Sequence, residues 1–264
     1  METKRNLKYF TAPPISIPAV IGWVITLAGV ILFAIGGSLR VPAIFVVIVG
    51  LATVVFASGG MSTDTDLEFQ AKERIKDLQE KSEKKFEVYE SKFLKMLKPI
   101  NLRGYDFEAK EQPFYYKKGK DGVHRTNYFV GTNLIFTSEK MFVYTRRFSL
   151  IDQSIDEETT ASFYFNELDH AEVEEKIYSY TKKDRKIDVK YHVFRILKSD
   201  GTPALEMCVD YGADIDKYCD QISRAIVTRQ KELAKRAEEA AVRRAEFRAK
   251  IEAEKAAEAA GEVL

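Results

Sequence analysis

Two stretches without ionisable side chains near the amino terminus constrain this chain most. Residues 15–35 contain no charged residue and no histidine, residues 41–57 contain none either, and only residues 36–40 separate them. An α-helix rises 1.5 Å per residue, so about 20 apolar residues cross the roughly 30 Å of hydrocarbon in a bilayer. The pattern predicts a transmembrane helical hairpin with helices at 15–36 and 41–58, and therefore an integral membrane protein.

Two other interpretations of these stretches are weaker. A buried helical hairpin in a soluble core would have the same composition, whereas a cleaved signal peptide has a shorter apolar run and no second run directly after it.

Lys4, Arg5 and Lys8 precede the first helix, Arg40 alone lies between the helices, and basic residues return at 72–76. Basic residues favour the cytoplasmic side, so both termini are expected to be cytoplasmic, with residues 1–14 as a cytoplasmic tail.

Small residues recur at seven-residue spacing in both predicted membrane helices. Such residues allow two helices to approach closely in lipid, where van der Waals contact replaces the hydrophobic effect as the driving force. We expect the two stripes to face each other, while a hairpin that serves only as an anchor remains the simpler interpretation. The predicted packing residues are Gly22, Gly29, Gly36, Ala43, Gly50 and Ala57.

Two charged helical segments flank the central part of the chain. Residues 62–98 have apolar side chains at three- and four-residue steps and end at Pro99, which predicts an amphipathic stalk helix. Residues 229–264 are mostly Ala, Glu, Arg and Lys, which predicts a solvated helical tail of coiled-coil character. Their similar lengths allow antiparallel pairing within the chain or pairing of either helix between copies, and the sequence does not decide between them.

The region between these helices is rich in aromatic and β-branched runs separated by turns. Connections too short for crossover helices make the expected sheet antiparallel, and an amphipathic helix follows the last strand. The chain is therefore predicted to be an α+β membrane protein with seven strands in residues 103–228. The expected strands are 113–118, 124–137, 140–146, 161–165, 171–176, 189–197 and 204–209.

Several segments of this region resemble the bacterial pleckstrin-homology-like and GRAM-like domains. They are GTNLIFTSEKMFVYTRR, FYFNELDHAEVEEK, YHVFRILKSDGTPALEMCV and ADIDKYCDQISRAI. The resemblance covers about residues 105–228 and rests mainly on the order of the elements. It implies a seven-stranded antiparallel barrel with a capping helix, and a bacterial cytoplasmic membrane as the location. On that helix, it implies a face toward the barrel made of Ile215, Tyr218, Cys219, Ile222 and Ile226.

The sequence offers little for catalysis or for a cofactor. It lacks the glycine-rich phosphate loops, the nucleophile elbow and the zinc-protease motif. His170 and Glu172 alternate on one strand face without a third metal ligand at a recognisable spacing. Cys208 and Cys219 lie in different elements and are expected to be free thiols in a reducing compartment. We therefore predict no enzyme, no cofactor and no metal site.

Basic side chains gather in two loops of the β region. Residues 151–175 hold nine acidic and no basic residues, whereas 176–198 hold eight basic and two acidic. In pleckstrin-homology domains the first strand loop binds phosphoinositide head groups, so the resemblance implies anionic-lipid contact at this loop, although the usual basic triplet is absent. The candidate lipid or partner-binding residues are Lys117, Lys118, Lys120, Arg125, Lys182, Lys183, Arg185 and Lys186.

Three functions follow from these features. The favoured prediction is a membrane-anchored scaffold that presents its β domain and helices to protein partners or to copies of itself. The alternatives are an anionic-lipid-binding sensor and an oligomeric effector or pore assembled through the hairpin. The 41 basic and 40 acidic residues leave a net charge of +1, which argues against a chain-wide nucleic-acid surface.

Overall fold

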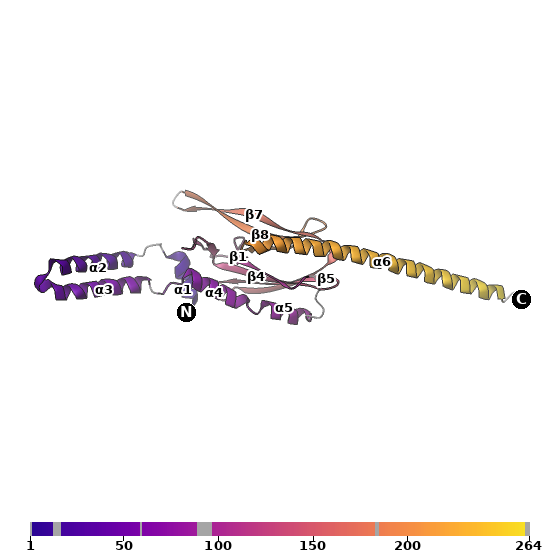
Figure 1. The fold of residues 1–264 in the computed structure, drawn as a ribbon, viewed down its shortest axis with the longest axis horizontal. Helices are drawn as coiled ribbons and strands as arrows, with labels where there is room; N and C mark the ends of the chain where they lie inside the picture. Colours follow the sequence, from indigo (N-terminus) through magenta and orange to yellow (C-terminus); the bar gives the residue numbers. More distant parts are fainter. Residues whose placement is uncertain (1, 13–16, 59, 89–96, 183–184, 262–264) are drawn as a thin grey trace.

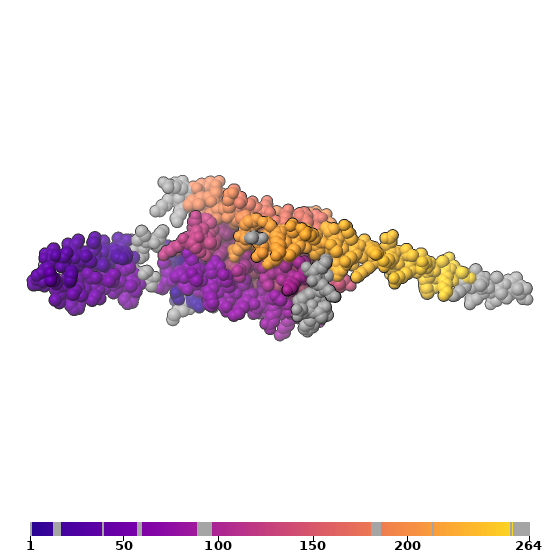
Figure 2. Space-filling model, in the orientation of Figure 1, coloured from indigo at the N-terminus to yellow at the C-terminus, as the bar shows by residue number. Residues whose placement is uncertain are grey.

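The molecule is elongated, with two apolar helices at one end, a mixed α/β domain in the middle and one long helix projecting from the other end (Figure 1). The structure, a computed structural model, describes residues 2–12, 17–58, 60–88, 97–182 and 185–261. The space-filling view shows the same three parts, with the terminal helix tapering away from the domain (Figure 2). The helices are α1 (Glu2–Thr11), α2 (Ile17–Ile35), α3 (Arg40–Ser58), α4 (Asp64–Ile75), α5 (Leu78–Phe86) and α6 (Ala213–Gly261), with 3-10 turns η1 (Gly37–Leu39) and η3 (Phe165–Glu167).

The two apolar helices differ in how well they meet the requirement for spanning a membrane. Within the described residues, α2 alone is long and apolar enough, with a mean hydropathy of 2.4. The apolar part of α3, Arg40–Phe56, is shorter. The structure thus supports one candidate span by length and composition, and the prediction of two is met only in part.

Small residues bring α2 and α3 into close contact. A Cβ atom added at Gly22 would lie 2.9 Å from the carbonyl oxygen of Gly50, and one added at Gly29 would lie 3.1 Å from that of Ala43. Gly36 lies outside this interface, because it has a φ of 81° and forms the turn before η1. The side chain of Ala57 lies outside the described part of the structure.

The predicted stalk is not one continuous helix. It is divided at Lys76 and Asp77 into α4 and α5, and α5 ends at Phe86, followed by Glu87, whose φ of 52° is left-handed. Both helices pack on the strands of the domain: the guanidinium of Arg74 lies 4.0 Å from the ring centre of Phe148, and Phe86 contacts Phe142. Residues 89–96 of the predicted stalk lie outside the described residues.

The described β region contains nine strands rather than seven, and no closed barrel. The order β1-β4-β5-β6 forms one sheet, β2-β3 a second and β7-β8-β9 a third, and every pairing is antiparallel as predicted. The turn η3 separates β6 from β7, so that β7 pairs with β8 in another sheet. The strands are β1 (Ile100–Tyr105), β2 (Tyr116–Lys118), β3 (His124–Thr126), β4 (Tyr128–Phe136), β5 (Lys140–Ser149), β6 (Asp156–Tyr164), β7 (Leu168–Lys182), β8 (Arg185–Lys198) and β9 (Pro203–Val209).

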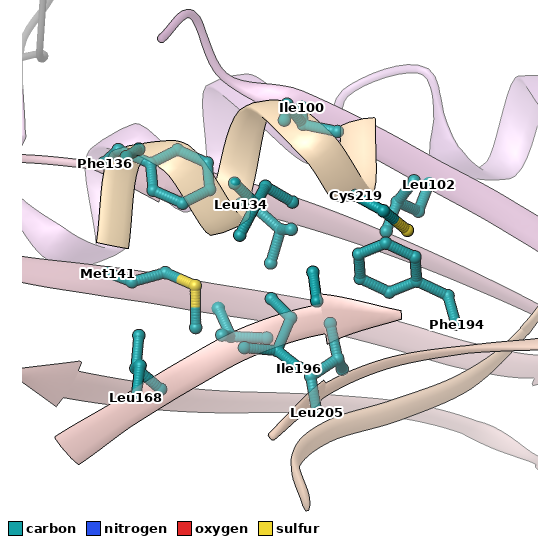
Figure 3. Packing of buried hydrophobic residues seen from close by; sticks show 14 of the residues in the cluster. Ile100, Leu102, Leu134, Phe136, Met141, Leu168, Phe194, Ile196, Leu205 and Cys219 are labelled. Atoms are coloured by element: carbon teal, nitrogen blue, oxygen red, sulfur yellow. The ribbon is translucent and has the colours of Figure 1, made fainter. Parts of the chain in front are cut away.

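Strand β4 is buried along its whole length because both of its faces are covered. Successive side chains of a strand point to opposite faces. Val130 and Leu134 belong to the main core, which also holds side chains of β7, β8, β9 and the first turns of α6 (Figure 3). On the other face, Gly131 leaves room for Ile75 of α4, and Asn133 accepts a hydrogen bond from Ser82 of α5. This sheet is thus enclosed between α4 and α5 on one face and the β7-β8-β9 sheet with the start of α6 on the other.

Helix α6 begins on the core and then leaves the domain. Ile215, Cys219, Ile222 and Ile226 are buried in the main core, and Tyr218 packs against it, so the five residues expected to face the β region do so. Cys219 and Cys208 are both free and buried. From residue 234 to 250 every α6 side chain is exposed, which contradicts antiparallel pairing with the stalk inside one chain.

Candidate functional site

The chain segments on either side of α2 and α3 meet the β domain at one junction. Helix α1 precedes the two apolar helices and α4 follows them, and the β2-β3 hairpin contacts both. The Lys117 ammonium donates to the carbonyl oxygen of Tyr9 in α1, and the Lys120 backbone amide donates to Asp64 of α4 at 2.7 Å. The junction therefore joins three parts of the chain that are distant in the sequence.

Helix α1, within the segment that we predicted as a cytoplasmic tail, is folded onto the domain. Its Asn6 is 1% exposed, and the side-chain amide donates to the carbonyl oxygen of Leu150 and to Gln70, both at 2.7 Å. The Asn6 oxygen accepts a hydrogen bond from Ser62. Buried polar groups need such partners, so these bonds fix α1 against the segment that follows α3.

Arg125 of β3 is the centre of the junction. Its side chain is 2% exposed and forms a two-pronged ion pair with Asp121, with N to O distances of 2.9 Å and 2.6 Å. Its Nε donates to Glu68 of α4 at 3.2 Å, and Asp64 lies 3.9 Å away. A planar guanidinium satisfies several carboxylates at once, which suits Arg for a buried position of this kind.

Two tyrosines complete the network as neutral donors. Tyr9 donates to Asp64 at 2.5 Å, and Tyr105 donates to Glu68 at 3.0 Å. Burial raises the pKa of both phenols well above the usual range, and the neighbouring carboxylates raise it further. The hydrogen bond from Arg125 lowers the pKa of Asp121 to about 2. The network therefore joins the Arg125 guanidinium to the side chains of Asp121, Glu68 and Asp64 and to two neutral hydroxyl groups.

The first basic loop divides into residues used inside the protein and residues left at the surface. The Arg125 side chain is buried in the ion-pair network. Lys117 contacts α1, with its ammonium 4.2 Å from the ring centre of Tyr9. The side chains of Lys118 and Lys120 are exposed. Of the four residues predicted here, two are therefore structural and two face solvent.

The second basic loop is only partly described. Lys183 lies outside the described residues, as do the side chains of Lys182 and Arg185. Lys186 is exposed, with its ammonium 3.6 Å from Asp188. The free end of the β7-β8 ribbon points toward the same end of the molecule as α2 and α3 (Figure 1).

A cleft of about 650 Å³ opens beside the Arg125 network. Its walls carry charges of both signs together with aromatic rings, and His192 stacks on Tyr211 with ring centres 4.1 Å apart. His170 contacts Asp169 and Glu172 elsewhere on β7. Among the described residues, no group of three or more His, Cys, Asp or Glu side chains is placed to hold a metal ion.

Comparisons with known proteins add no assignment to this geometry. No family model, no curated protein and no solved structure matches the chain. The junction was not foreseen from the sequence, although Asp64 and Glu68 stand one helical turn apart and could have indicated a shared cationic partner.

Proposed function

We propose that this protein is a membrane-anchored scaffold. In this proposal α2 and α3 cross the membrane together as a hairpin, both termini are cytoplasmic, and the β domain and α6 are displayed to protein partners. We also keep the pleckstrin-homology-like assignment of the domain as a proposal, supported by antiparallel strands followed by a helix over the core.

The observation that carries the proposal is the apolar surface of α2 and α3. Trp23 is 60% exposed and Phe56 is 84% exposed, and large apolar side chains are exposed along both helices. Soluble proteins seldom expose continuous apolar surface of this extent, whereas lipid would cover it. The soluble-core alternative needs these side chains to be buried.

The anchor is also joined to the domain at both ends. Helix α1 precedes α2 in the chain and helix α4 follows α3. Both are hydrogen-bonded within the Arg125 junction. The Gly22 and Gly29 faces are occupied by α3, so they are not free to assemble copies into a pore. A fixed platform that carries interaction surfaces agrees best with this arrangement.

Cysteine accessibility in intact cells tests the anchor and its orientation. Ser38→Cys in the turn between the helices should react with a membrane-impermeant maleimide from outside, whereas Gln153→Cys in the domain should react only after lysis. The native thiols are buried and provide the unlabelled background. Recovery of the chain in the soluble fraction, or labelling of residue 153 in intact cells, would contradict the proposal.

A second function, contact with anionic lipid, is favoured by the position of Lys118 and Lys120. The loop that carries them is bonded to Tyr9 and Asp64, which stand close to the start of α2 and the end of α3. With α2 and α3 in the membrane, exposed cations on this loop would lie near the lipid head groups. Each cation contributes about 1 kcal/mol to binding at an anionic surface.

Hydrogen exchange of the full-length protein in nanodiscs tests this function. Amides of 116–126 should exchange more slowly in discs with anionic lipid than in neutral discs, and the difference should disappear in the triple variant Lys118→Glu, Lys120→Glu, Lys186→Glu. Glutamate at Lys217, Lys231 and Lys235, which are exposed on α6, is the matched control. Equal exchange in the two disc types would exclude the lipid function.

A further inference from the structure

The outer half of α6 is a helix without a partner in this chain. Residues 234–253 are exposed except for Ile251, which is half-buried, and the helix projects from the end of the domain opposite α2 and α3 (Figures 1 and 2). Among the described residues, no ion pair within 4 Å involves a side chain of this stretch. A helix of this length with only one half-buried side chain is available for an interaction.

Charges on this stretch separate onto two sides. At about 100° per residue, side chains within roughly 80° of Ala240, which itself lies about 20° from Phe247, form one side of the helix and the remainder form the other. The side centred near Phe247 carries five basic and no acidic residues: Arg236, Arg243, Arg244, Arg248 and Lys250. The opposite side carries Glu238, Glu239, Glu246 and Glu252, with Lys235 as its only cation.

An apolar row runs through the basic side. Ala240, Phe247 and Ile251 follow at seven- and four-residue steps, and Phe247 is 65% exposed. Aromatic and Arg side chains are the residues most enriched at the energetic centres of protein interfaces. An exposed phenylalanine among arginines therefore has the composition of a docking surface.

We propose that the Phe247 side of α6 binds an acidic amphipathic helix of a partner protein. Apolar side chains of the partner would cover Phe247 and Ala240, and its flanking carboxylates would pair with Arg243 and Arg244, as in helix-to-helix recognition. This inference rests on the proposed scaffold function and specifies the chemistry of the partner.

Other occupants fit this surface less well. A second copy would place cations against cations, which costs free energy in either helix direction. Helices α2 and α3, which are proposed to span the membrane, lie at the other end of the molecule (Figure 1). Nucleic acid would satisfy the arginines through its phosphates but would leave the Phe247 row against a charged backbone.

Binding of two synthetic peptides to the full-length protein in nanodiscs tests the proposal. One is a four-heptad helical peptide with Leu at the core positions and Glu at the flanking positions, and the other has Lys in place of Glu. Fluorescence anisotropy should show binding of the acidic peptide, at least about tenfold tighter than the lysine peptide and weaker at higher salt.

Matched variants separate the proposed face from general electrostatics. Arg243→Glu with Arg244→Glu should weaken acidic-peptide binding about tenfold or more, whereas Lys231→Glu with Lys235→Glu on the other side should change it little. Phe247→Ala should weaken binding, and Val242→Ala, also exposed but on the opposite side, should not. Both comparisons use one helix, and the two charge-reversal variants change its net charge by the same amount.

The outcomes distinguish this inference from the scaffold function. Absence of acidic-peptide binding, equal binding of both peptides, or equal loss in the paired variants would overturn it. So would α6-dependent dimers in mass photometry, or tighter binding of a DNA duplex than of the acidic peptide. In each case the cysteine-accessibility result would still decide the anchor independently.

Discussion

Replacing Arg125 with alanine is expected to lower the free energy of unfolding by about 3 kcal/mol, because a buried cation is removed while its carboxylate partners remain. Asp121, Glu68 and Asp64 would then face one another without the guanidinium that they share. Thermal denaturation of the detergent-solubilised protein, followed by near-ultraviolet circular dichroism, measures the loss. Lys118→Ala, an exposed change on the paired strand β2, is the control and should be close to neutral.

The same variant should change how stability depends on pH. Asp121 has a pKa of about 2 in the folded protein, below the value of about 3.9 for an unfolded chain. Its contribution is therefore present above about pH 4 and is lost as the pH falls toward 2. Without Arg125 this part of the acid dependence should disappear. An unchanged midpoint at neutral pH, together with an unchanged acid profile, would show that the network is not a stabilising junction.

Replacing Gly104 with valine is expected to destabilise the domain by about 3 kcal/mol, at the upper end of the cost of overpacking. A Cβ atom at this position would lie 2.7 Å from the carbonyl oxygen of Cys208 and 2.7 Å from the Cα of Val209. These are backbone atoms, so no side-chain rotation can relieve the overlap. Strand β1 would have to move away from β9 or lose its pairing with β4.

Gly212→Val is the matched control for this substitution. Nothing lies within 4 Å of a Cβ atom built at Gly212, and the residue is exposed. Chemical denaturation of both variants in the same detergent gives the comparison. If Gly104→Val and Gly212→Val unfolded at the same denaturant concentration, the close approach of β1 to β9 would not be a packing constraint.

The strands that were predicted well are those whose pattern is local. The antiparallel pairing of β4 with β5 and of β8 with β9 follows from short turns and alternating side chains. The run 124–137 was predicted as one strand, but Asn127 interrupts it: its side chain bonds to the backbone of Tyr115 and Pro113. The interruption at Asn127 depends on these contacts with an earlier segment of the chain. The sequence pattern within 124–137 therefore does not reveal it.

The predictions of a closed barrel and of a continuous stalk helix were wrong for a related reason. Each depends on which surface an amphipathic element covers, and periodicity gives the apolar side of an element without its partner. The apolar side of 64–86 covers β4 and β5, and β6 and β7 belong to different sheets.

The candidate site was predicted only at the level of charge. The basic loop of 117–125 was found from its composition, but composition treats Arg125 and Lys118 alike. Burial separates them, since Arg125 lies against α4 and Lys118 extends into solvent. Helix α1 gave a weaker signal still, because ten residues with four charges near a terminus resemble an unstructured tail.

The attachment of the domain at both α1 and α4 has a consequence for geometry at the membrane surface. A domain on a single linker could swivel, but two bonded connections leave it little freedom to rotate about the bilayer normal. If the apolar pair spans the membrane as proposed, the exposed part of α6 then holds Phe247 at a set height above the lipid. Partners would be selected by their reach as well as by their charge, and shortening α6 by whole turns would change which of them can bind.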